Sequence, residues 1–381
     1  MVERIRGYAE GYYGKLLTWS DRCDLLDALA RNRQNTYYYA PKEDSLHRLN
    51  WRAPYDASWL ANFTRFTDTA SAKKIEVVAG VAPGLDFNFQ HLPHGPDFIS
   101  LLDKCRCLLN AGASHISLLL DDIDEDFATR CATFKSEGAA HASLANALSD
   151  ELGQQLWVTP RIYANELVGS APDYLPDFLR ELGGEHAVLY CGSDVVASIA
   201  SVEAILEAVS VCRQRLILWD NLYANDYCPR RLFVGPWTGR HAGQDILLNP
   251  TGMPKTDVLL LALMASSGAE GGAEKNQLAA WKEVLLAHDV PEAFFSIAEY
   301  FYHPVCNGIL PLEPTVSVTT VLGAIEECLW RWKTPLSREW YPYIFGLKHD
   351  LLASRGELPE LRVNKTQNYP LAQVLRRSTI K

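Results

Sequence analysis

Several large protein classes are excluded by what the sequence does not contain. No apolar run approaches the ~20 residues that span a membrane, and the longest run covers residues 258–265. Lys and Arg form no run longer than a pair, and 36 basic residues against 46 acidic ones leave a net charge of −10. Nucleic-acid-binding proteins usually carry a basic surplus or stripe. We therefore expect neither a membrane span nor a nucleic-acid partner.

Cysteine patterns and common catalytic motifs are also missing. The sequence has 9 cysteines but no CxxC pair, and the closest spacing is Cys105 to Cys107. Neither a zinc site nor a disulfide framework is implied. The first residues have no apolar core of the signal-peptide type, so we expect a cytoplasmic protein with reduced cysteines. The strings HExxH, GxxxxGK[ST] and GxSxG do not occur, which disfavours metalloproteases, P-loop NTPases and serine hydrolases.

One pattern repeats over the first 250 or so residues: a short apolar run, a polar or Gly/Pro break, and a helical stretch. Such spacing is too long for hairpins and suits a crossover helix between parallel strands. The runs predict eight strands and hence a (β/α)8 TIM barrel. A doubly wound open sheet is the alternative, but no run is followed by the dinucleotide fingerprint GxGxxG. The expected strands cover residues 4–9, 36–40, 76–81, 115–120, 156–160, 187–191, 216–219 and 246–248.

Helical periodicity fills the rest of the chain. Ser20 with Asp21 and Asp56 are expected to cap two of the barrel helices, and residues 201–211 carry an amphipathic stripe. We predict a catalytic barrel over residues 1–268 and a helical C-terminal domain over residues 269–381. The many aromatic residues of that domain are expected to form its core, although some could form a homodimer surface. The expected C-terminal helices cover residues 278–287, 292–302, 319–332, 338–352 and 371–377.

The most informative strand end reads Asp121-Asp122 after a mainly apolar stretch, residues 116–120. Adjacent carboxylates repel each other, so their pKa values are expected to separate, with one ionised and one protonated near neutral pH. That pairing suits glycosidic bond cleavage. A calcium loop is a rival interpretation, because Asp124 and Asp126 follow, but Phe127 and Thr133 stand where such a loop needs Gly and Glu. The carboxylates could also cap a helix beginning near Glu125.

Residues suited to a sugar follow the other predicted strands. Sugars need hydrogen-bonding groups for their hydroxyls and aromatic faces for their C–H surfaces. Each residue also has a structural explanation: Trp219 as barrel core, Asn249 as a turn residue before Pro250, and Lys42 as a solvated lysine. Their coincidence at strand ends favours a sugar site. The polar candidates are Lys42, Asn221, Asn225, Asp226 and Asn249, and the aromatic candidates are Tyr12, Tyr13, Tyr163, Tyr190 and Trp219.

Several strings over residues 5–255 resemble glycoside hydrolase family 84, the β-N-acetylglucosaminidases that include protein O-GlcNAcases. Their order and their position at predicted strand ends make the resemblance specific. It departs from the family pattern at Thr159-Pro-Arg-Ile-Tyr163, at Glu43 and at Tyr190-Cys-Gly-Ser-Asp194. The matching strings are Glu10-Gly-Tyr-Tyr-Gly14, Asn35-Thr-Tyr-Tyr-Tyr-Ala-Pro-Lys42, Pro83-Gly-Leu-Asp86, Leu120-Asp-Asp-Ile-Asp124, Trp219-Asp-Asn221, Ala224-Asn-Asp-Tyr227, Arg231-Leu-Phe-Val-Gly-Pro236 and Leu248-Asn-Pro250.

The resemblance implies a retaining exo-acting hexosaminidase whose substrate supplies its own nucleophile, the 2-acetamido oxygen, through an oxazoline intermediate. By that resemblance Asp121 polarises the acetamido group, and Asp122 is first the general acid and then the general base. Tyr163 would donate to the acetamido oxygen, Trp219 would wall the methyl pocket and Asn221 would orient the acetamido side. Sugar hydroxyls would be bound by Lys42, Asp226, Asn249 and the Gly11 carbonyl.

The resemblance implies no metal and no cofactor, and its substrate is a GlcNAc-bearing glycan or glycoprotein. One alternative is an endo-acting hydrolase of a GlcNAc-containing glycan such as hyaluronan. Another is a catalytically silent barrel that only binds sugar.

Overall fold

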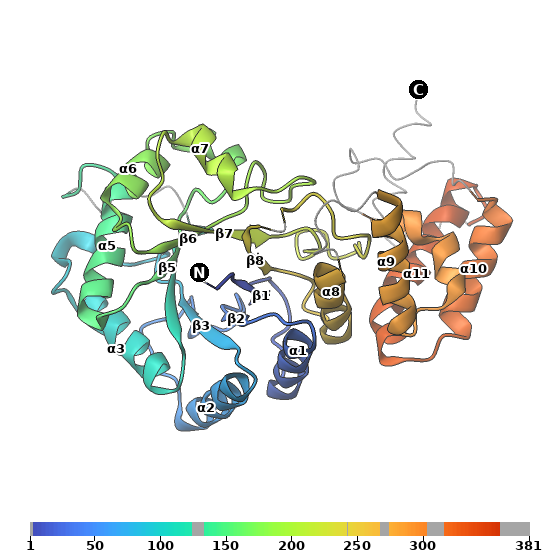
Figure 1. Cartoon of the computed structure of the whole chain (residues 1–381), viewed down its shortest axis with the longest axis horizontal. Coiled ribbons are helices and arrows are strands. Elements are labelled where there is room, and N and C mark those ends of the chain that lie inside the picture. The colour runs from blue at the N-terminus through green and yellow to red at the C-terminus, as the bar shows by residue number, and fades with distance from the viewer. Residues whose placement is uncertain (1–2, 124–132, 242, 267–273, 303–315, 359–381) are drawn as a thin grey trace. The chain divides into compact units, whose positions relative to one another are not determined.

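The computed structural model describes residues 3–123, 133–241, 243–266, 274–302 and 316–358. Eight parallel strands form a closed barrel in sequence order, and the first strand pairs with the last (Figure 1). The predicted (β/α)8 barrel is therefore confirmed, and closure excludes the open sheet. The strands are β1 (Arg6–Glu10), β2 (Thr36–Tyr39), β3 (Glu76–Val81), β4 (His115–Leu119), β5 (Trp157–Thr159), β6 (Ala187–Tyr190), β7 (Arg215–Asp220) and β8 (Asp245–Leu248).

Helices surround the strands on the outside of the barrel (Figure 1). Asp56 caps α2 as predicted, with its side chain accepting from the Trp59 amide at 2.7 Å. The predicted cap at Ser20 and Asp21 is wrong, because Thr18 caps α1 and Asp21 closes a reciprocal capping box. The helices are α1 (Trp19–Arg31), α2 (Ala57–Ala72), α3 (Pro96–Asn110), α5 (Glu137–Leu152), α6 (Tyr174–Glu181) and α7 (Ile205–Ala208), with short 3₁₀ helices η1 (Phe89–His91), η2 (Asn165–Ser170) and η3 (Val202–Ala204).

The helix predicted over residues 201–211 is shorter than expected. Only η3 and α7 form there, and the chain becomes extended at Val209. Ile205 is fully buried, whereas Leu206 and Val211 are exposed. The apolar stripe therefore extends beyond the helix and overstates its length.

Aromatic and aliphatic side chains fill the barrel interior. Tyr38 of β2 contacts the ring of Trp157 on β5 and the edge of Trp219 on β7. Its hydroxyl donates to Ser117 Oγ at 2.6 Å, so this polar atom is satisfied inside the core. The interior is thus solid, as in other barrels of this kind, and ligands must bind at an end of it.

The chain divides into two compact units, one of residues 1–221 and 239–254 and the other of residues 222–238 and 255–381. The second unit therefore contains α8 (Pro254–Ser266) and the segment 222–238 as well as the C-terminal helices. The predicted boundary between residues 268 and 269 falls outside the described residues and stays a prediction.

Apart from α8, the helical unit contains α9 (Glu274–Ala287), α10 (Val318–Trp330) and α11 (Pro335–Ser354) (Figure 1). The helix expected over residues 292–302 is instead two 3₁₀ turns, η4 (Glu292–Ser296) and η5 (Ala298–Phe301). Phe294 and Trp340 pack together in the core, as predicted for the aromatic residues, whereas Trp330 and Tyr341 are exposed. The helix expected over residues 371–377 lies outside the described residues.

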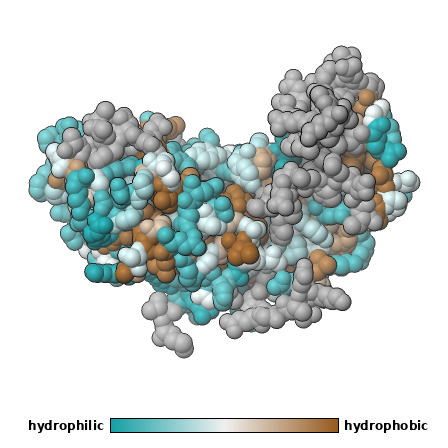
Figure 2. All heavy atoms as spheres, turned by 90° about the horizontal axis from the view of Figure 1, so that it is seen from above, coloured by the Kyte–Doolittle hydropathy of each residue, from teal (hydrophilic) through white to brown (hydrophobic). Residues whose placement is uncertain are grey.

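Exposed apolar side chains are scattered over the described surface. On the face drawn in Figure 2, hydrophilic residues alternate with small, separate hydrophobic patches. Leu49, Ile99 and Ile199 are among the exposed apolar residues. No described helix combines the length and apolar character needed to cross a bilayer.

One buried carboxyl of the helical unit couples stability to pH. Asp350 of α11 is 8 % exposed, and its Oδ1 atom has no hydrogen-bond partner. Burial raises the pKa of Asp350 to about 8, against a smaller lowering by the Arg230 charge. The folded state therefore keeps a proton that the unfolded chain releases at pH ~4. This contribution to stability is complete at acidic pH and is lost as the pH rises toward 8.

We predict that Asp350→Asn becomes progressively more stable than the unmodified protein between pH 5 and pH 8. The amide does not titrate, so the gap in the free energy of unfolding should widen by ~1 kcal/mol or more. Urea unfolding at both pH values measures it. Asp103→Asn, on the exposed face of α3, is the control. Equal pH dependence of the Asp350 variant and the unmodified protein would contradict the assignment.

Candidate active site

The two adjacent aspartates lie at the carboxyl end of β4, where active sites of such barrels form. Asp121 is buried, and 31 % of the Asp122 side chain is exposed. Asp122 has a φ of +53°, a left-handed backbone conformation that few residues other than Gly, Asn and Asp adopt readily. This turn directly follows the buried strand, and it brings both carboxylates to one lysine.

Lys42, which follows β2, lies between the two carboxylates. Its ammonium contacts Asp121 Oδ2 and lies 3.6 Å from Asp122 Oδ2. The Lys42 side chain is 3 % exposed, so it is not a solvated surface lysine. A cation in this position offsets the repulsion between two neighbouring carboxylates.

Three other side chains hold Asp122. The hydroxyls of Tyr13 and Tyr163 donate to Oδ2 and Oδ1 respectively, each at 2.9 Å. Arg48 Nη2 donates to the main-chain carbonyl of Asp122 at 2.6 Å. The carboxylate and the backbone of Asp122 are therefore fixed by groups from the loops after β1, β2 and β5.

These contacts determine the protonation state of Asp122. Burial alone would raise its pKa, but the Lys42 charge, the two tyrosine hydroxyls and the Arg48 charge outweigh burial and hold the pKa below its usual value. Burial and the neighbouring carboxylates raise the pKa of Tyr163, which stays a donor. The expectation that one aspartate of the pair holds a proton near neutral pH therefore does not apply to Asp122 in this arrangement.

Asp121 offers an unused acceptor. Its Oδ1 atom is buried and has no hydrogen-bond partner, while Oδ2 contacts Lys42. A buried carboxylate oxygen without a donor is costly and is uncommon in folded proteins. An N–H group of a bound molecule would satisfy it.

A second group of predicted residues is connected by hydrogen bonds at the ends of β1, β7 and β8. The Gly11 amide donates to Asn249 Oδ1 at 3.2 Å, and Asn249 Nδ2 donates to Asn221 Oδ1 at 2.9 Å. Trp219 Nε1 donates to the same Asn221 oxygen at 3.0 Å. A side chain on Gly11 would lie 2.3 Å from the Trp219 ring, so only glycine fits here.

Cys191 links the two groups, because its main-chain amide donates to the Tyr163 carbonyl at 2.7 Å. Asn221 Nδ2 donates to Cys191 Sγ at 3.5 Å and to the Val195 carbonyl at 2.9 Å. Burial and the charges of Asp220, Asp121 and Asp122 raise the pKa of Cys191. One end of the barrel unit thus holds eight of the predicted site residues, and their roles stay predictions: Gly11, Lys42, Asp121, Asp122, Tyr163, Trp219, Asn221 and Asn249.

Two predicted polar residues lie in the helical unit. Asp226 belongs to segment 222–238, and its sugar-binding role stays a prediction. The side-chain Nδ2 of Asn225 donates to the Arg231 carbonyl at 2.8 Å and to the Tyr343 hydroxyl at 3.2 Å. Asn225 therefore holds its own segment together.

The sequence did not identify Arg48 as a site residue, and it did not explain the role of Asp220. Arg48 binds a main-chain carbonyl, and no residue pattern signals such a contact. Asp220 is fully buried and forms a bidentate pair with Arg240, at 2.7 and 3.0 Å, so it stabilises the barrel. The atypical Arg161 turns to Glu137 of α5 in a pair at 2.6 and 2.7 Å, and its guanidinium is thereby engaged outside the Asp122 cluster.

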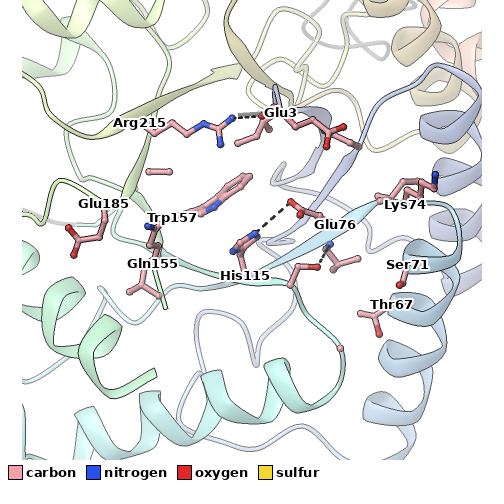
Figure 3. A pocket seen from close by; sticks show the side chains of 18 residues that line it. Glu3, Thr67, Ser71, Lys74, Glu76, His115, Gln155, Trp157, Glu185 and Arg215 are labelled. Carbon is pink, nitrogen blue, oxygen red and sulfur yellow. Dashed lines mark hydrogen bonds and ion pairs between the residues drawn. The ribbon is translucent and has the colours of Figure 1, made fainter. Parts of the chain in front are cut away.

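A cavity of about 570 Å³ opens at the opposite end of the barrel (Figure 3). It is lined by residues at the amino ends of the strands, among them Glu76, His115, Trp157 and Arg215. In such barrels this end contributes to stability rather than to catalysis. Among the described residues, no group of three or more His, Cys, Asp or Glu side chains is placed to hold a metal ion. Asp124 and Asp126, which the calcium interpretation needs, lie outside those residues.

The chain is similar to known proteins in sequence and in fold. A family model described as beta-N-acetylglucosaminidase matches residues 6–293. The chain is 32 % identical over 242 residues to the protein O-GlcNAcases of Rattus norvegicus and of Mus musculus, covering 61 % of this chain and 26 % of each relative. The match thus spans about a quarter of these relatives' length. The solved structure of CpGH84B is similar in fold, with a TM-score of 0.73 at 21 % identity, over 99 % of this chain and 72 % of that one.

We predict that Lys42→Met raises the pKa of Asp122, because the ammonium is the strongest of the groups that lower it. Titration of the aspartate carboxyl carbons by NMR measures the change. Lys15→Met, which removes an exposed lysine from the loop after β1, should leave that pKa where it is. An unchanged Asp122 titration in the Lys42 variant would show that the ion pair does not govern the site.

Proposed function

Because the chain belongs to the β-N-acetylglucosaminidase family, glycoside hydrolase family 84, we propose that it is a retaining exo-β-N-acetylglucosaminidase. Its substrate would be a terminal β-linked GlcNAc on a protein or glycan. One observation carries the proposal: Asp121 has a buried carboxylate oxygen without a partner, next to an Asp122 that three loops hold in place. Such a pair can bind an amide and transfer a proton at neighbouring points of one sugar.

In the proposed first step the substrate provides the nucleophile. The acetamido N–H donates to Asp121 Oδ1, and the acetamido oxygen forms a bond to the anomeric carbon. The glycosidic C–O bond breaks, and the leaving oxygen takes the proton of Asp122. The product of this step is an oxazoline protonated on nitrogen, an oxazolinium ion whose N–H stays hydrogen-bonded to Asp121 Oδ1. This ring closure matches the substrate-assisted exception to the two-carboxylate scheme.

The second step reverses the roles. A water molecule attacks the anomeric carbon of the oxazoline, its proton passes to Asp122, and the bond to the acetamido oxygen breaks. The sugar leaves with its original anomeric configuration because two inversions have occurred. No step uses a metal or a cofactor.

The pKa of Asp122 links this chemistry to binding. In the structure Tyr163 donates to Asp122 and helps to keep it ionised. By the family resemblance Tyr163 turns to the acetamido oxygen of the substrate. That change removes one donor from Asp122, and the sugar displaces water from a carboxylate that burial already destabilises as an anion. Both effects raise the pKa and favour the protonated acid needed for the first step.

The remaining predicted residues would bind the sugar itself. Trp219 and Asn221 would form the acetamido side, while Lys42, Asp226, Asn249 and the Gly11 carbonyl would contact hydroxyls. The Gly11–Asn249–Asn221–Trp219 connection supports this, because it holds these groups before substrate arrives. An endo-acting hydrolase and a silent sugar-binding barrel are the alternatives, and turnover of short and long substrates distinguishes them. Cytoplasmic location and a homodimer through the helical unit are further parts of the proposal.

We predict that Asp122→Asn loses at least ~10²-fold in kcat/KM on a β-GlcNAc glycoside with a poor leaving group, and far less on one with an activated phenol. An activated leaving group departs without a proton, so it does not need the acid. Chromogenic and alkyl glycosides compared in the same variant, with and without a chelator, measure the difference. The exposed Asp103→Asn serves as the control. Equal losses on both substrates would rule out the acid role, and loss of turnover on chelation would restore the metal interpretation.

A thiazoline analogue of the oxazoline is expected to inhibit at concentrations far below the KM of the substrate, because it resembles the cyclised species. Initial rates at increasing inhibitor concentrations give the inhibition constant. Absence of inhibition at millimolar concentration would exclude participation of the acetamido group.

A further inference from the structure

Segment 222–238 is part of the connection between β7 and β8 of the barrel, yet it packs as part of the helical unit. A loop at the carboxyl end of a barrel strand normally carries functional residues. Here that loop carries Asp226. The contacts that hold this segment in place come from three separate parts of the helical unit.

The second half of the segment is held by main-chain bonds. The Val234 amide donates to the Phe301 carbonyl at 2.8 Å, and the Gly235 amide donates to the Tyr302 carbonyl at 3.2 Å. Trp281 Nε1 of α9 donates to the Val234 carbonyl at 2.7 Å. A side chain on Gly235 would lie 2.5 Å from the Tyr302 carbonyl oxygen, so glycine is required for this approach.

The first half is tied to α11 and to the second half. Asn225 is 5 % exposed, and its side-chain Nδ2 donates to both the Tyr343 hydroxyl of α11 and the Arg231 carbonyl. The Tyr223 hydroxyl donates to the Gly235 carbonyl at 2.7 Å and joins the two halves. Asp226, which follows Asn225, accepts from the Tyr227 amide at 2.9 Å.

We propose that Trp281 and Tyr343 are positioning residues for Asp226, and that the helical unit thereby sets the affinity of the enzyme for the sugar hydroxyls. This proposal rests on the proposed function, in which Asp226 accepts from those hydroxyls. Neither residue needs to touch the substrate. Tyr343 acts through Asn225, the immediate neighbour of Asp226, and Trp281 acts through the Val234 carbonyl and the segment as a whole.

Steady-state kinetics on a chromogenic β-GlcNAc glycoside test the proposal with Tyr343→Phe and Trp281→Phe. Each variant removes a hydrogen-bonding group and keeps a ring, and each should raise KM about 3- to 20-fold while kcat changes less than about 2-fold. In an Asp226→Asn background the same changes should have little further effect on KM, because their target is already lost.

Two matched controls come from the same unit. Tyr341→Phe alters an exposed tyrosine of α11 whose ring stacks on Phe345. Trp330→Phe alters an exposed tryptophan of α10 whose Nε1 donates to Glu326. Both variants should retain the KM of the unmodified enzyme.

Hydrogen exchange provides a readout that does not depend on turnover. The amides of residues 222–238 should exchange faster in Tyr343→Phe and Trp281→Phe than in the unmodified protein and the two controls, while amides of the barrel strands stay unchanged. Unchanged exchange in the segment overturns the positioning role whether or not the protein is a hydrolase.

The kinetic outcomes separate the two proposals. If KM rises equally with and without Asp226, the two residues do not act through Asp226, and the positioning proposal is wrong while the hydrolase assignment stands. If the unmodified protein does not hydrolyse the glycoside, the proposed function is wrong, and the affinity part of the positioning proposal falls with it.

Discussion

The arrangement of the site depends on the Lys42 ammonium between two neighbouring carboxylates. Without a cation, Asp121 and Asp122 at the end of a buried strand would repel each other in an environment that also disfavours their charge. Lys42 stabilises both anions. It thereby permits Asp121 to keep one oxygen unused and lets Asp122 accept from two tyrosines. The same charge lowers the proton affinity of Asp122, so an acid role requires that binding alter this balance.

The barrel supplies the rigidity that such a site needs. Strand order brings the loops after β1, β2, β4 and β5 to one end, and the interior is filled by Tyr38, Trp157 and Trp219. The Trp219 ring therefore lies where Gly11 approaches it closely, and Asn221 and Asn249 complete the connection. Because these side chains already hold one another in place, they lose little conformational freedom when a ligand binds.

Much of the barrel could be predicted because parallel strands covered on both faces are continuously apolar. The strand predicted over residues 76–81 has the same limits as β3. The ends of the other predicted strands lie within about two residues of the observed ends. Helix ends were harder. Ser20 and Asp21 have the residue types of a cap, but Thr18 takes that place because Asp21 completes its capping box. The stretch 292–302 has helical spacing but follows Pro291 and forms only two 3₁₀ turns.

The sequence predicts those site residues whose side chains line the site. It does not predict those whose side chains hydrogen-bond to main-chain groups. Asp121, Asp122 and Tyr163 follow from their strand ends. Arg48 donates to the main-chain carbonyl of Asp122. Asn225 is polar enough to bind a sugar, but its side-chain amide donates to the Arg231 carbonyl of its own segment. These contacts depend on the tertiary path of two loops, which no local pattern encodes.

The sharing of segment 222–238 has a consequence for any attempt to reduce the chain to its barrel. A protein that ended after the last strand would keep the segment and lose α9, η5 and α11. The Val234 carbonyl, the Val234 and Gly235 amides and the Asn225 side-chain amide would then lose these partners and hydrogen-bond to water instead. The smallest part of this chain that keeps segment 222–238 in its observed contacts is therefore larger than its eight βα repeats.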